Sequence, residues 1–172
     1  MKVPTTEKVS RIAYAAVPSG WLAHQIRAVH AQLGGTADLS LSQTCTFWPE
    51  WHQYRETMYR IADGIKAGDN ACTEIAVRYL ILNYFGSYSG YLRELLARRL
   101  KHAALTEAQQ VRLHQHFSAL LLSGAQQREL KECAKLWRLL ATADQILSLA
   151  ADVCNAGPEI RQRFARIFPE FA

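Results

Sequence analysis

Apolar residues recur three and four positions apart along most of this chain. The clearest case is the series Trp51, Tyr54, Met58, Ile61 and Ile65. Residues at these steps share one face of an α-helix, because the helix turns by about 100° per residue. Glycine, proline and capping residues separate such stretches. The pattern therefore predicts an all-α protein.

These glycine, proline and capping residues divide the chain into eight or nine short helices. Helical spacing predicts them near residues 9–16, 19–33, 49–66, 70–82, 91–102, 106–122, 125–141, 142–154 and 158–168. Four residues are expected to cap helix starts: Ser19, Asp69, Thr106 and Thr142. Residues 36–46 alternate like a strand, but a single strand has no partner, so an extended loop is expected there.

Short helices joined by tight turns are compatible with two architectures. One is an irregular multi-helix bundle, the other is a short solenoid-like stack, and the spacing leaves both open. A chain of 172 residues fits a single all-helical domain over residues 1–172. The glycine-rich turn at residues 86–90 is the clearest place for a subdomain boundary.

The closing segment Pro158-Glu-Ile-Arg-Gln-Arg-Phe-Ala-Arg-Ile-Phe resembles the second half of a HEAT-type repeat. Such repeats often carry proline or aspartate, then a hydrophobic residue and then arginine. The resemblance extends over residues 106–172 at most, and no fixed repeat period emerges along the chain. It implies a solenoid-like stack of helices for that part of the protein.

Bulk properties favour a cytoplasmic protein. The longest apolar runs, such as residues 79–82 and 119–122, are far shorter than the roughly 20 residues of a membrane-spanning helix. The apolar patch at residues 12–17 is too short for the core of a secretory signal, so none is expected. The 4 cysteines stand singly and form neither a zinc-finger nor a C-x-x-C motif. We therefore expect reduced thiols, no metal or other cofactor, and no membrane partner.

Positive charge gathers in the second half of the chain. Residues 1–86 carry eight Lys or Arg and seven Asp or Glu, whereas residues 87–172 carry twelve and eight. The formal net charge of +5 therefore lies mainly after residue 86. Such a balance favours acidic partners.

One basic stripe is predicted on the helix near residues 125–141. Its members are Arg128, Lys131, Lys135 and Arg138, at steps of three, four and three. At these steps they lie within roughly 80° of one another on one helix face. Glu132 can partly offset Arg128 or Lys135, but Lys131 and Arg138 have no acid at helical spacing. The stripe is either a solvated surface or a site for carboxylates or phosphates.

A second basic cluster follows the turn at residues 86–90. Its members are Arg93, Arg98, Arg99, Lys101 and His102. On a helical wheel Arg99 falls inside the apolar stripe. It therefore either forms a buried ion pair that fixes helix register or contacts an anion in a groove. Tyrosines next to this cluster also resemble the stacking platforms of proteins that bind single-stranded nucleic acid.

Aromatic residues concentrate between residues 47 and 91. Most are expected to fill the core. Trp48 and Tyr59 fall off the main apolar stripe and are candidate interface residues, because Trp and Tyr combine a large apolar body with one polar tip. Trp21 lies off the stripe of its own helix and is a further candidate.

One group of residues has the composition of a catalytic site. His52, Glu56 and Asp63 lie within about 40° of arc on a helix, where a histidine and a glutamate can share a proton or bind a metal. A catalytic zinc site needs a third ligand and usually an H-E-x-x-H motif, which the sequence lacks. His114 and His116 diverge by about 200° on a helix and are not expected to share one ion.

The basic helix faces and the absence of a coherent catalytic motif predict a non-enzymatic helical binding protein of the adaptor, regulator or inhibitor type. The expected partner is an acidic protein surface, and the sequence leaves the oligomeric state open. Nucleic acid bound by the same basic faces is the second hypothesis. A metal-dependent hydrolase at His52, Glu56 and Asp63 is the third.

Overall fold

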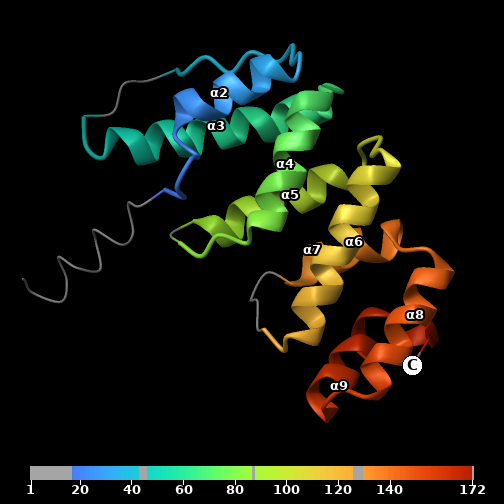
Figure 1. Cartoon of the computed structure of the whole chain (residues 1–172). Helices are drawn as coiled ribbons and strands as arrows, with labels where there is room; N and C mark the ends of the chain where they lie inside the picture. Colours follow the sequence, from blue (N-terminus) through green and yellow to red (C-terminus); the bar gives the residue numbers. More distant parts are fainter. Residues whose placement is uncertain (1–16, 43–45, 87, 126–129, 172) are drawn as a thin grey trace, which may run out of the picture.

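The computed structural model describes residues 17–42, 46–86, 88–125 and 130–171. These ranges contain eight α-helices, one short 3₁₀ helix and no strand, which confirms the predicted all-α fold (Figure 1). The helices are α2 (Ala23–Gln32), α3 (Pro49–Lys66), α4 (Asn70–Leu82), α5 (Ser89–Leu100), α6 (Glu107–Leu122), α7 (Leu130–Leu140), α8 (Ala143–Cys154), α9 (Pro158–Ile167) and η1 (Pro169–Phe171). None of them is long and apolar enough to span a membrane. The helix predicted at residues 9–16 lies outside the described residues.

Helix starts follow the predicted capping chemistry in most places. The hydroxyls of Thr106 and Thr142 each accept a hydrogen bond from the backbone N–H three residues on. Asp69 does the same with its carboxylate at the start of α4. Ser19 does not cap α2, because a turn over residues 18–21 comes first and the helix begins four residues later than expected.

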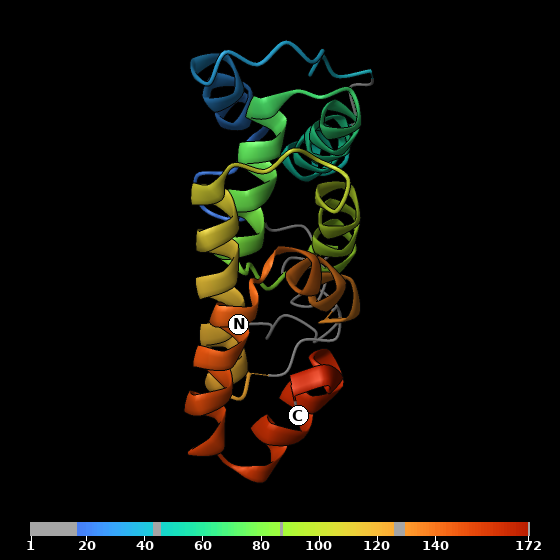
Figure 2. The ribbon, with the colours of Figure 1, turned by 90° about the vertical axis from the view of Figure 1, so that its right-hand side faces the viewer.

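The helices alternate between two layers along the chain. Figure 2 shows α3, α5, α7 and α9 in one layer and α2, α4, α6 and α8 in the other. Within the layers, α3 packs on α5, α5 on α7 and α4 on α6; most consecutive helices pack across the layers. Because the helices range from 10 residues in α2 to 18 in α3, the result is an irregular multi-helix bundle stacked in two layers.

One core runs between the two layers. Its largest fully buried side chains include Trp137, Tyr54, Tyr79, Phe168 and Met58. Buried side chains of both α4 and α5 belong to it. The core is therefore continuous across the turn at residues 86–90, where the sequence suggests a subdomain boundary.

Candidate binding surface

Charge is divided unevenly between the two layers. Helices α3, α5, α7 and α9 carry twelve Lys or Arg and six Asp or Glu, a net of +6, whereas α2, α4, α6 and α8 carry three and four, a net of −1. We call the first group the basic layer. Its helices alternate in sequence with those of the other layer, so it is folding that brings the excess positive charge together on one side of the protein. A one-sided excess of this kind attracts acidic molecules to that side.

The outer side of α7 carries three of the four residues of the predicted basic stripe. Lys131, Lys135 and Arg138 are all exposed, and we call these three the α7 ridge. Arg128, the fourth residue, lies outside the described residues. The described part of α7 begins at Leu130, so the ridge spans two turns of one continuous helix.

Two acids partly offset the charge of the α7 ridge. Glu132 is buried below it and accepts hydrogen bonds from Lys101, at the end of α5, and from Lys135, both at 2.7 Å. These two hydrogen bonds lower the pKa of Glu132 to about 2. Arg138 lies 3.7 Å from Glu170 of η1, so tertiary packing supplies an acid that helical spacing does not. A loose, half-exposed pair of this kind binds weakly and leaves Arg138 accessible.

Arg93 does not belong to the exposed surface. It is only 2% exposed, and its guanidinium donates a hydrogen bond to the Tyr84 carbonyl in the connection between α4 and α5. The prediction that it contributes to an exposed basic cluster is therefore wrong. The physical reason is that a buried guanidinium needs hydrogen-bond acceptors, and the Tyr84 carbonyl supplies one.

Arg98 and Arg99 do lie on the basic layer. Arg98 is exposed and pairs with Glu94, one turn earlier in α5, at 2.5 Å. The side chain of Arg99 is 29% exposed and lies 3.8 Å from Asp63 of α3. Of the two alternatives for Arg99, this contact favours an ion pair between helices over an anion site. The pair is partly solvated, so its contribution to stability is small.

The aromatic candidates belong to α3 of the same layer, Trp48 as the residue just before its first turn and Tyr59 within the helix. Trp48 is 40% exposed and Tyr59 is 38% exposed. The Tyr59 hydroxyl is 2.5 Å from that of Tyr88, and Arg55 stands over the rings of Trp51 and Tyr88 at 4.9 and 5.6 Å. These contacts link α3 to the start of α5 through rings that remain partly open to solvent.

Trp21 lies elsewhere, beside α2 and α4. Its ring meets that of Tyr79 edge-on, with centroids 5.3 Å apart, and it packs against the core. It also lines an apolar groove of about 220 Å³ together with Ile26 and Ile75. Trp21 therefore serves largely to pack against the core. Its position off the apolar stripe of its own helix did not predict this, because the contact is with another helix.

The three residues of the hypothetical catalytic group do not converge. The Glu56 carboxylate accepts hydrogen bonds from the backbone N–H and the hydroxyl of Ser42. Asp63 is directed to Arg99, and the His52 ring stacks edge-on against Trp51. Each side chain is engaged by a different neighbour, so the arrangement does not favour the metal-dependent hydrolase.

A buried polar cluster that the sequence did not predict joins α2, the following loop and α4. One Asp69 oxygen accepts hydrogen bonds from the backbone N–H groups of Thr36 and Ala37, at 2.6 and 2.7 Å, and lies 3.1 Å from His30 Nε2. The other accepts the N–H of Cys72, at 2.8 Å. Burial alone would raise the pKa of this carboxyl, but hydrogen bonds from the N–H groups of Cys72, Ala37 and Thr36 outweigh that effect and hold it well below its usual range.

The same cluster has the residue types of a metal site. Ligand atoms of His30, Asp69 and Cys72 lie within 4.8 Å of one another. However, both Asp69 oxygens already face backbone N–H groups, which repel a cation. Burial, together with the charge of Asp69, raises the pKa of the Cys72 thiol to about 12, which favours the protonated thiol over the thiolate. Gly35 and Gly64 allow this packing, because a Cβ on either would overlap the His30 ring or the Cys72 sulfur. The cluster is a structural anchor for the loop.

The other two histidines of interest take separate partners, as their spacing predicts. His114 Nδ1 accepts a hydrogen bond from Trp137 Nε1 at 3.0 Å. The His116 ring instead lies beside Phe117, with centroids 5.6 Å apart. Burial lowers the pKa of both imidazoles, which favours their neutral form.

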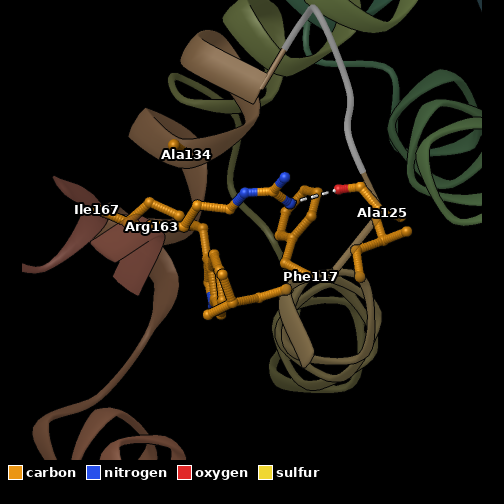
Figure 3. A pocket seen from close by; sticks show the side chains of 8 residues that line it. Phe117, Ala125, Ala134, Arg163 and Ile167 are labelled. Atoms are coloured by element: carbon orange, nitrogen blue, oxygen red, sulfur yellow. Dashed lines mark hydrogen bonds between the residues drawn. The ribbon is translucent and has the colours of Figure 1, made fainter. Parts of the chain in front are cut away.

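The last helix adds arginines to the basic layer, beyond the predicted binding residues. Arg161 and Arg166 of α9 are exposed. Arg163 instead crosses a narrow apolar slot between α6, α7 and α9 and donates to the carbonyls of Gly124 and Ala125 at 3.0 and 2.9 Å (Figure 3). The slot has a free volume of about 10 Å³, room for a single water, so it is not a ligand site.

Three kinds of comparison bear on the identity of this chain. No protein-family model matches it. No curated protein and no solved structure matches it either.

Proposed function

We propose that this chain is a non-enzymatic binding protein that contacts an acidic protein surface through its basic layer. The observation that carries the proposal is the separation of charge between the two layers, with a net of +6 on one and −1 on the other. The exposed α7 ridge lies at the middle of the basic layer, next to α5 and α9. A protein of the adaptor, regulator or inhibitor type needs such a surface and no catalytic centre.

The basic layer suits a protein partner better than a nucleic acid. It retains six carboxylates among its twelve cations. A duplex carries one phosphate charge per about 1.7 Å of its axis, so it would meet those carboxylates of the layer that are open to solvent, which excludes the buried Glu132, as well as the cations. A protein surface can place its own acids and bases to match a mixed pattern. The exposed rings of Trp48 and Tyr59 add the side-chain types that anchor protein interfaces.

Fluorescence anisotropy with a labelled Asp/Glu-rich peptide and a labelled single-stranded oligonucleotide tests the proposal. We expect the peptide to bind more tightly than the oligonucleotide at physiological salt. The double reversal Lys131→Glu and Arg138→Glu, which leaves the hydrogen bond between Lys135 and Glu132 in place, should abolish peptide binding with little change in thermal stability. Tighter binding of the oligonucleotide, with a steep dependence on salt, would support the nucleic-acid alternative instead.

A matched pair of single reversals controls for net charge. Lys131→Glu and Arg27→Glu each change the chain by two charges, but the first lies on the α7 ridge and the second on α2 in the other layer. Only Lys131→Glu should weaken the peptide complex. Equal losses from both variants would mean that total charge, and not the basic layer, controls binding.

A further inference from the structure

An exposed apolar side chain lies beside the α7 ridge. Leu139 is 66% exposed, although α7 has a buried face nearby that includes Leu136 and Trp137. At 100° per residue, Leu139 lies about 40° from Lys135 and about 100° from Arg138, at the edge of the cationic arc. An exposed leucine on its own is unremarkable. Its position against three exposed cations gives this face both an apolar and an electrostatic component.

We infer that the acidic partner presents an amphipathic segment, with a large apolar side chain that packs on Leu139 and flanking carboxylates that pair with the α7 ridge. This inference rests on the proposed function and specifies the chemistry of the partner at the same surface. Charge complementarity fixes the sign of the flanking groups, since Lys131, Lys135 and Arg138 are all exposed. Burial of Leu139 against the partner contributes favourable binding free energy. Ion pairs at a solvated surface contribute little, so charge alone would give weak binding.

The contrast between the two layers supports this assignment. Leu147 of α8 is also highly exposed, at 57%, but it lies in the layer with a net charge of −1. Its neighbour one turn earlier is Asp144, an acid. Leu147 therefore offers similar apolar area without the cations, and it provides a matched control for Leu139.

Two synthetic peptides test the inference by fluorescence anisotropy with the full chain. In the first, leucine alternates with Asp and Glu; in the second, each leucine is replaced by serine, so that the charge is the same. We expect the leucine peptide to bind about tenfold more tightly, the effect of covering most of one exposed leucine. Leu139→Ser should remove this preference, whereas Leu147→Ser should leave it unchanged, and thermal melting should show both variants folded.

The outcomes separate the inference from the proposed function. If both peptides bind the wild-type chain equally, and charge reversal of the α7 ridge abolishes both, the apolar component is overturned while the acidic-partner function stands. If neither peptide binds at concentrations up to about 1 mM, the inference and the proposed function are both wrong. If Leu147→Ser removes the preference as strongly as Leu139→Ser does, the leucine peptide recognises apolar surface in general and the inference fails.

Discussion

Replacing Asp69 by alanine should destabilise this protein more than the same change at any other acidic residue that the structure describes. The carboxylate caps α4 through Cys72 N–H and holds the backbone N–H groups of Thr36 and Ala37. Loss of an N-cap costs about 1 kcal/mol. Each donor left without its partner, the two loop amides and His30, adds roughly 1 kcal/mol. We therefore expect a loss of about 3–5 kcal/mol in the free energy of unfolding, a large part of the stability of a typical domain.

Urea unfolding at pH 7, followed by circular dichroism, measures this loss. Asp38→Ala is the control, because Asp38 is an exposed acid of the same loop whose hydrogen bonds reach only Ser40; it should cost less than about 0.5 kcal/mol. Asp69→Asn should lie between the two, because asparagine also caps helices well. If Asp69→Ala costs no more than Asp38→Ala, the cluster is not the anchor described above.

The acid dependence of Asp69 gives a second test of the same reasoning. Its pKa is lower in the folded chain than in the unfolded chain, where it is about 3.9. The charged carboxylate therefore contributes its full stability above that value, and the contribution falls as the pH falls toward the folded pKa. The difference in stability between the wild-type chain and Asp69→Ala should shrink in acid. A difference that stays constant from pH 7 to about pH 2 would contradict the assignment.

Three further predictions concern other parts of the fold. Glu132→Gln should lower the free energy of unfolding by about 1–2 kcal/mol at pH 7, because the buried carboxylate, whose pKa is about 2, accepts hydrogen bonds from two ammonium groups. This loss, measured by urea unfolding at several pH values, should become smaller only below about pH 4.3, the pKa of a glutamate in the unfolded chain. Gly64→Ala should lower the melting temperature, because its Cβ would overlap the Cys72 sulfur; an unchanged temperature would show that the helices can separate. Trp137→Ala should lower the free energy of unfolding, measured in urea, by about 3–5 kcal/mol, because Trp137 is 1% exposed. A decrease of less than about 1 kcal/mol would contradict its place in the core.

Local sequence signals predict the elements of this fold well. Helical spacing and Gly or Pro breaks locate the helices of the described residues, and Thr106 and Thr142 cap α6 and α8 as predicted. The described part of the expected extended loop, residues 36–42, contains no helix or strand. These features depend on residues a few positions apart, where chain geometry is fixed by the helix itself.

Contacts between distant residues are what the sequence could not predict. Asp69 meets His30 and Thr36 across 39 and 33 positions, and no periodic pattern encodes such a contact. Arg93 shows the same limitation, because its burial depends on the Tyr84 carbonyl in the preceding connection. The charge of the basic layer could not be predicted either, because its helices are not consecutive in sequence but alternate with those of the opposite layer.

We propose that an acidic protein surface binds the basic layer at the α7 ridge. Lysine acetylation, followed by mass spectrometry with and without a saturating Asp/Glu-rich peptide, measures whether this ridge is covered in the complex. The peptide should protect Lys131 and Lys135 of α7, while Lys66, exposed at the end of α3, reacts at the same rate in both samples. Unchanged reactivity of Lys131 and Lys135 in the presence of bound peptide would contradict the claim.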